Sequence, residues 1–131
     1  MAKMIHTMVR VTNAEQSIKF YHALFNLHEK RRLTFDDFTL IYLGNEDSDF
    51  ELELTHNHAQ KNQYELGNGY GHLAFATPDL NSLHQLAIEL GYKPKEIKQF
   101  FNHSTLIATF FFITDPDGYD IEVIERSKIY R

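Results

Sequence analysis

The chain repeats one order of predicted elements within 131 residues, and this repeat constrains the fold more than any single motif. In positions 4–57 a strand is followed by a helix and three further strands, and the same order returns in positions 70–126. We therefore expect an α+β fold in which two tandem βαβββ modules form a curved mixed sheet. A chain of this length has the size of one domain, so both modules are assigned to a single domain over residues 1–131.

The first module begins with alternating residues at 4–11, which predict a strand with His6 and Arg10 on one face. Asn13 lies three residues before Gln16, a spacing typical of a helix N-cap. The later segments predict a hairpin broken at Asp36-Asp37 and a strand through Leu52 and Leu54. A polar stretch at 56–70 predicts a linker between the modules.

The second module begins with a predicted strand at 71–76. Thr77-Pro78-Asp79 predicts a helix start with Pro78 at the first helical position, and Gly91 is expected to end this helix. The buried stripe of the helix is expected to comprise Leu80, Leu83, Ala87 and Leu90. Strands are predicted at 94–100, 105–113 and 119–125, with Asp115-Pro116-Asp117-Gly118 as a type I turn before the last strand.

Composition excludes several classes of protein. The 13 Lys and Arg residues against 18 Asp and Glu give a net charge of −5, which disfavours nucleic-acid binding. The absence of cysteine excludes disulfides, thiolate metal sites and cysteine nucleophiles. No apolar run reaches the roughly 18 residues of a membrane span, and the N-terminus lacks the pattern of a secretory signal. We expect a cytoplasmic enzyme or binding protein whose metal ligands, if any, are His, Asp or Glu.

Each module places one histidine on its first strand and one glutamate on its last strand. His6 corresponds to His72, and Glu53 corresponds to Glu122. Taken singly, such residues are ordinary, because a carboxylate on an alternating strand usually faces water. Together, two imidazoles and two carboxylates would suit an octahedral divalent ion with two positions open to substrate, which is a catalytic arrangement.

Six segments spread over residues 4–126 resemble the glyoxalase I family of the vicinal oxygen chelate superfamily. They are Ile5-His6-Thr7-Met8-Val9-Arg10-Val11, Ser17-Ile18-Lys19-Phe20-Tyr21, Glu53-Leu54-Thr55-His56-Asn57, Tyr64-Glu65-Leu66-Gly67, Tyr70-Gly71-His72 and Asp115-Pro116-Asp117-Gly118-Tyr119-Asp120-Ile121-Glu122. The Asp-Pro-Asp-Gly turn recurs across the superfamily. The other segments point to glyoxalase I, and to its short bacterial form.

The resemblance implies that His6, Glu53, His72 and Glu122 bind a divalent metal. It implies nickel as the first choice, with cobalt and zinc as alternatives, because short bacterial members favour nickel or cobalt. It also implies a homodimer with active sites at the subunit interface, where His6 and Glu53 come from one chain and His72 and Glu122 from the other.

The implied reaction is lactoylglutathione lyase activity, which detoxifies methylglyoxal. The hemithioacetal of methylglyoxal and glutathione is isomerised to S-lactoylglutathione through an enediolate. Glu122 is expected to act as the base that moves the proton between the adjacent carbons. Glu53 is expected to act as the base for the opposite stereoisomer of the hemithioacetal. Arg10 and Asn57 match family positions that hold the γ-glutamyl end of glutathione.

One segment departs from the family pattern. Family members usually carry a Lys- and Gly-rich loop that holds the glycine carboxylate of glutathione, whereas residues 97–105 contain aromatics instead. Lys98 or His103 could supply the cation. A dimer-contact or core role is weighed equally with a substrate role for Phe100 and Phe101. A different thiol is therefore an alternative to glutathione. The remaining histidines are expected to face solvent at helix or loop positions, without chemistry: His22, His28, His56, His58, His84 and His103.

Two further classes of function are alternatives to the glyoxalase I activity that the resemblance implies. A metal-dependent thiol transferase or a ring-cleaving dioxygenase of the same superfamily typically uses two His and one Glu, so retention of both His6 and Glu53 argues against it. A non-catalytic protein that sequesters small molecules has usually lost the ligands, and four are retained here.

Overall fold

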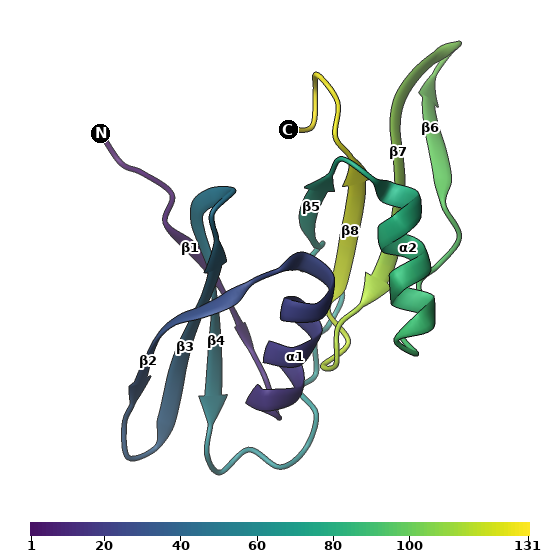
Figure 1. Cartoon of the computed structure of the whole chain (residues 1–131). Coiled ribbons are helices and arrows are strands. Elements are labelled where there is room, and N and C mark those ends of the chain that lie inside the picture. Colours follow the sequence, from purple (N-terminus) through teal and green to yellow (C-terminus); the bar gives the residue numbers. More distant parts are fainter. The chain divides into compact units, whose positions relative to one another are not determined.

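The internal repeat is confirmed by two units of the same topology. A computed structural model describes residues 1–131, which divide into Met1–Glu65 and Leu66–Arg131. Each unit contains one helix and one four-stranded mixed sheet, so the expected α+β class and the two βαβββ modules are correct (Figure 1).

The elements of the first unit are β1 (His6–Arg10), α1 (Ala14–Phe25), β2 (His28–Thr34), β3 (Phe38–Asn45) and β4 (Ser48–Asn57). Those of the second unit are β5 (Leu73–Thr77), α2 (Leu80–Glu89), β6 (Lys98–Asn102), β7 (Thr105–Thr114) and β8 (Asp120–Glu125). The strand order is β1-β4-β3-β2 in one sheet and β5-β8-β7-β6 in the other. The first and last strands of each unit pair in parallel, and the other pairs are antiparallel.

Local sequence signals explain where the first unit's helix begins and ends. The Asn13 side chain accepts a hydrogen bond from the Gln16 N–H at 3.1 Å, as the N-cap spacing predicts. Asn26 ends the helix in the left-handed conformation, with φ of 54°. Phe20 and Tyr21 on this helix are fully buried, and they provide the core on which one face of the sheet packs.

The second unit differs from the sequence prediction in four details. Asp79 is the N-cap of α2, because its carboxylate accepts hydrogen bonds from Ser82, so Pro78 precedes the helix instead of starting it. Leu90 lies at the C-cap and is 48% exposed, beyond the buried stripe. The strand expected from residue 94 begins at Lys98, after a proline that has no N–H to donate to a sheet. His72 directly precedes β5 instead of lying within it.

The turn before β8 forms as predicted, and its hydrogen bonds fix the direction in which β8 begins. The Gly118 N–H donates to the Asp115 carbonyl at 3.0 Å, and Gly118 has φ of 94°, which favours glycine. The Asp115 carboxylate accepts from the N–H groups of Asp117 and Tyr119 at 2.9 and 3.0 Å. No helix of the structure is long and apolar enough to span a membrane.

Candidate metal centre

The alternation of side chains along the strands separates a core face from an open face in the first unit. Val9, Ile41 and Leu54 point to the core face and are buried. Because side chains alternate, the open face carries His6 and Arg10 of β1, Tyr42 of β3, and Glu51, Glu53, Thr55 and Asn57 of β4. The predicted site residues of this unit therefore share one sheet face.

His6 and Glu53 form a close pair on this open face. The His6 Nε2 atom lies 3.1 Å from Glu53 Oε1, and the two side chains are 35% and 10% exposed. The second oxygen of the carboxylate, Oε2, accepts a hydrogen bond from the Tyr42 hydroxyl at 3.0 Å. Glu53 is thus buried and bonded at both oxygens, unlike an ordinary strand carboxylate that faces water.

Arg31 packs on the Tyr42 ring and is itself anchored by Glu51. The guanidinium carbon of Arg31 lies 4.2 Å from the centroid of the Tyr42 ring, and Arg31 donates to both oxygens of Glu51 at 2.7 and 3.3 Å. The hydrogen bond from Arg31 to Glu51 raises the pKa of the Arg31 guanidinium. Burial, together with the hydrogen bond to Glu53, raises the pKa of Tyr42, so its hydroxyl remains a proton donor at neutral pH.

The second unit reproduces the histidine–glutamate pair with the same atoms at the same distance. His72 Nε2 lies 3.1 Å from Glu122 Oε1, and the side chains are 41% and 18% exposed. Phe112 of β7 stands opposite Glu122 in the antiparallel register, as Tyr42 stands opposite Glu53. Its ring meets the His72 ring edge-on at 5.1 Å. The two pairs differ in that a phenylalanine offers no hydroxyl to the carboxylate.

Each pair has the geometry of half a metal site. Two adjacent ligands at right angles, each about 2.1 Å from an ion, lie about 3.0 Å apart. The 3.1 Å between imidazole nitrogen and carboxylate oxygen in both pairs matches this separation. A neutral imidazole and a carboxylate are also donors that divalent nickel, cobalt and zinc accept. No group of three or more potential metal ligands occurs in the structure.

Arg10 and Asn57 lie farther along the same open face of the first unit. The backbone of Arg10 pairs with Thr55, two residues beyond the position that pairs with Glu53. Asn57 ends β4, and its amide donates to the Tyr64 hydroxyl at 3.0 Å. The polar row therefore extends from the His6–Glu53 pair along the β1–β4 ladder.

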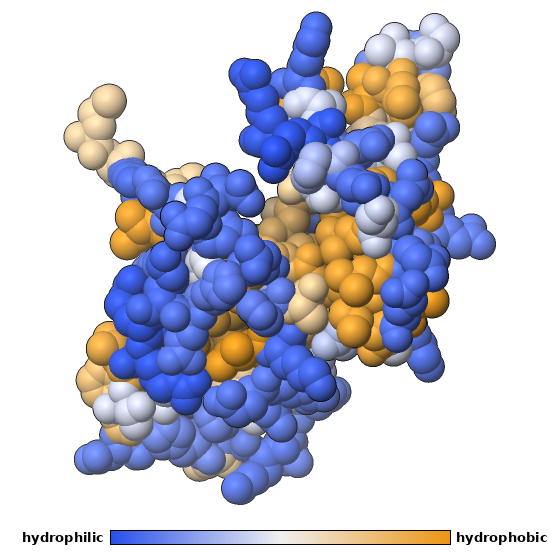
Figure 2. Space-filling view, viewed as in Figure 1, coloured by the Kyte–Doolittle hydropathy of each residue, from blue (hydrophilic) through white to orange (hydrophobic).

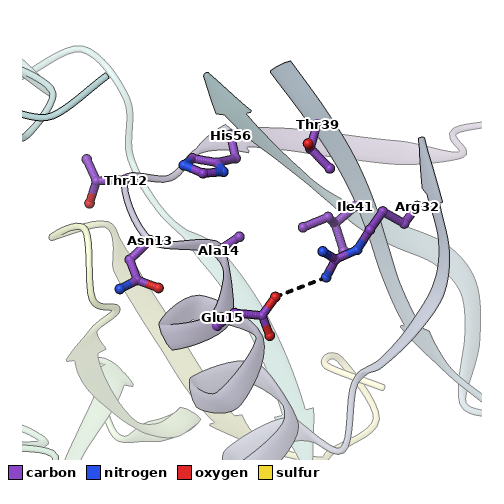
Figure 3. A pocket seen from close by; sticks show the side chains of 8 residues that line it. All are labelled: Thr12, Asn13, Ala14, Glu15, Arg32, Thr39, Ile41 and His56. Carbon is purple, nitrogen blue, oxygen red and sulfur yellow. Dashed lines mark hydrogen bonds and ion pairs between the residues drawn. The ribbon is translucent and has the colours of Figure 1, made fainter. Parts of the chain in front are cut away.

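The hollow in the first unit lies on the opposite face of the sheet. It has a volume of about 410 Å³ and is lined by the start of α1 and by core-side residues of β3 and β4, including Thr39, Ile41 and His56 (Figure 3). An ion pair between Glu15 and Arg32, with an N–O distance of 3.2 Å, crosses it. Neither the His6–Glu53 pair nor the His72–Glu122 pair lines this hollow, and we assign the hollow no part in the site.

The expected solvent exposure is wrong for His56 and His84, and the expected helix or loop position is wrong for His28 and His56, whereas His28 is exposed as expected. His28 and His56 lie on strands, and His56 is half-buried because it points to the core face. His84 on α2 is half-buried as well, and its ring meets Phe111 edge-on at 4.9 Å. His56 and His84 are thus partly covered by the fold, which single-residue reasoning does not detect.

The atypical segment at 97–105 forms a hairpin. Strands β6 and β7 pair through it, and His103 adopts a left-handed conformation with φ of 56° at the turn. Phe100 and Phe101 are 58% and 49% exposed, which excludes them from the core. Figure 2 shows apolar surface near the turn of this hairpin, where Leu106 is exposed too.

Comparisons with known proteins agree on one family. The family model described as Glyoxalase/Bleomycin resistance protein/Dioxygenase superfamily matches residues 3–123. A relative from Synechocystis sp. named probable lactoylglutathione lyase is 35% identical over 129 residues, which cover 95% of this chain and 96% of the relative.

Two solved structures extend the likeness to three dimensions. Glyoxalase I from Zea mays matches with a TM-score of 0.83 and 30% identity over 96% of this chain, which spans 45% of the maize chain. The glyoxalase I of Leishmania major, described as trypanothione-dependent, matches with a TM-score of 0.75 and 30% identity over 95% of this chain and 87% of its own.

Proposed function

The chain belongs to the Glyoxalase/Bleomycin resistance protein/Dioxygenase superfamily, and we propose that within it the chain is a glyoxalase I, a lactoylglutathione lyase. The observation that carries this proposal is the duplicated pair of His Nε2 and Glu Oε1, each separated by 3.1 Å. Near-full-length similarity to a relative of that name supports it. The substrate is the hemithioacetal of methylglyoxal and a thiol, and the product is the corresponding lactoyl thioester.

His6, Glu53, His72 and Glu122 would hold a divalent ion, and nickel is our first choice. Such an ion supplies Lewis acidity toward the two adjacent oxygens of the substrate. The proton transfer itself is the work of a carboxylate. Glu122 takes the proton from one carbon and returns it to the neighbouring carbon.

Arg10 and Asn57 bind the thiol part of the substrate in this proposal. A guanidinium pairs with a carboxylate through two parallel hydrogen bonds, and Arg10 lies on the open face roughly 13 Å along β1 from His6. Glutathione is our first choice of thiol. The Leishmania major relative is described as trypanothione-dependent, so trypanothione is the alternative thiol.

We further propose that both units act as one domain and that two copies of the chain form a homodimer. One copy then supplies His6 and Glu53 and the other supplies His72 and Glu122, which completes a set of four ligands. Phe100, Phe101 and Leu106 support association, since three exposed apolar side chains on one hairpin gain free energy when another surface covers them.

The proposal is tested by thioester formation from methylglyoxal and glutathione. We expect the purified protein to form the thioester, to lose activity after exhaustive chelation, and to regain it most fully with Ni²⁺, less with Co²⁺ and least with Zn²⁺. The product is quantified by its thioester absorbance, and metal content is measured on the same samples.

Two controls make this experiment decisive. Trypanothione replaces glutathione in a parallel reaction, so a preference for the second thiol would revise the substrate while keeping the reaction. The His6→Ala and His72→Ala variants should bind less metal than the wild type. If no metal restores thioester formation with either thiol, the chain is not a glyoxalase I.

A further inference from the structure

We propose that Tyr42 is a positioning residue that fixes Glu53 as the stationary carboxylate of the site, and that its absence opposite Glu122 leaves that carboxylate able to move. This inference rests on the proposed function, because it concerns how two equivalent ligands divide their tasks. It follows from a difference between two otherwise matched half-sites.

The first half-site binds its carboxylate at both oxygens. Glu53 Oε1 faces His6 Nε2 at 3.1 Å, and Oε2 accepts the Tyr42 hydroxyl at 3.0 Å. With 10% of its side chain exposed, the carboxylate has little access to water that could replace the tyrosine. Rotation of Glu53 away from His6 would therefore leave a half-buried hydroxyl without its acceptor, which is unfavourable.

Tyr42 is itself prevented from moving with Glu53. Arg31 covers one face of its ring at 4.2 Å and is anchored by two hydrogen bonds to Glu51, on the same strand as Glu53. The His6 ring also contacts the Tyr42 ring edge-on, with centroids 5.8 Å apart and planes at 76°. Residues on the three other strands of the sheet thus hold the Tyr42 hydroxyl in a defined place.

The second half-site lacks this restraint. Phe112 occupies the register position of Tyr42 and packs on His72, but it cannot donate a hydrogen bond. Glu122 is bonded to His72 through Oε1 and is 18% exposed, nearly twice the fraction of Glu53. A carboxylate that must leave its ligand position to carry a proton needs such freedom, whereas one that only holds the ion does not. In this inference Glu53 is a ligand only, and its expected base role for the opposite stereoisomer is given up.

We therefore expect reciprocal substitutions in the two half-sites to have different effects, one on nickel affinity and the other on kcat. Tyr42→Phe removes the hydroxyl and makes the first half-site like the second. Because partners that orient a metal ligand contribute about 10- to 100-fold to metal affinity, we expect Ni²⁺ to bind about 10- to 100-fold more weakly. The kcat at saturating Ni²⁺ should change much less than the affinity, since the proton is carried by Glu122.

Phe112→Tyr makes the second half-site like the first and supplies a donor for Glu122. We expect kcat at saturating Ni²⁺ to fall at least about 10-fold, toward the loss that removal of a general base produces. Nickel affinity should stay at the wild-type value or become tighter, because an oriented carboxylate binds at least as well. The double variant should combine weak binding with a low kcat.

The experiment measures nickel dissociation constants by competition with a chromophoric chelator, and kcat and KM at saturating nickel, for the wild type and these three variants. Thermal unfolding of the metal-free proteins shows that each variant is folded. Weakened nickel binding in Tyr42→Phe with a nearly unchanged kcat supports the inference. Equal nickel affinity in the wild type and Tyr42→Phe overturns it, as does a Phe112→Tyr variant with wild-type kcat.

Failure of the inference is distinguishable from failure of the proposed function. A wild-type protein that binds nickel and forms the thioester, together with a silent Tyr42→Phe substitution, overturns only the role of Tyr42. A wild-type protein that binds no nickel, cobalt or zinc overturns the proposed metal site, and the role of Tyr42 with it.

Discussion

Replacement of Glu122 by glutamine is expected to lower kcat by about 10²- to 10⁴-fold, the contribution typical of a general base. Glutamine keeps the length of the side chain and an oxygen that can face His72, so the second half-site retains its shape. The amide nitrogen cannot accept the substrate proton, and the amide oxygen is far less basic than a carboxylate. The measurement is kcat at saturating Ni²⁺ with metal content checked on the same sample, so that loss of metal is separated from loss of the base.

Glu125 provides the matched control for this substitution. It lies on the same strand as Glu122 but is exposed, and the alternation of β8 directs it to the opposite face. Glu125→Gln removes the same charge from the same strand, and we expect it to leave kcat unchanged. An unchanged kcat in Glu122→Gln would exclude Glu122 as the base and would favour Glu53 as the base instead.

The face on which His6, Glu53 and Glu122 lie could be predicted from the sequence, because strand side chains alternate with a period of two. That rule placed His6 and Arg10 together and set Glu53 apart from Leu52 and Leu54. The identity of neighbouring strands was not predictable in this way. β1 pairs with β4 across the whole first unit, and the parallel register that sets Met8 beside Glu53 depends on helix and hairpin geometry between them.

Tyr42 illustrates what single-strand reasoning misses. Its alternating position already placed it on the open face, but only the β3–β4 register shows that it stands opposite Glu53. That register is determined by the short connection between Asn45 and Ser48, which no residue pattern within β3 reports. A comparison of the two modules in such a register would have exposed the exchange of Tyr42 for Phe112.

Leu90 shows the opposite error, in which a pattern was extended too far. Apolar spacing continued the stripe of α2 to this residue, whereas the helix ends at Glu89 and Gly91 turns the chain with φ of 85°. Beyond the last helical turn the period of 3.6 residues no longer determines which way a side chain points, and the Leu90 side chain is exposed to solvent. Helix ends need capping evidence as well as periodicity.

Truncation of Phe111 is the second large effect that we expect, and it acts on stability. Phe111 is 1% exposed and meets the ring of His84 on α2 at 4.9 Å. Phe111→Ala should lower the free energy of unfolding by about 3–5 kcal/mol, because the removed ring leaves a cavity between the helix and the sheet. Denaturant unfolding followed by circular dichroism measures this change.

Phe35→Ala is the control, because the same side chain is removed from a position that is 48% exposed and lies outside the hairpin assigned to association, and we expect a change of at most about 1 kcal/mol. A loss below about 1 kcal/mol in Phe111→Ala would show that this ring is not part of the core. The expected large loss also concerns the site. A slip of one residue in β7 would exchange the faces of Phe111 and Phe112, so burial of Phe111 is what keeps Phe112 beside His72 and opposite Glu122.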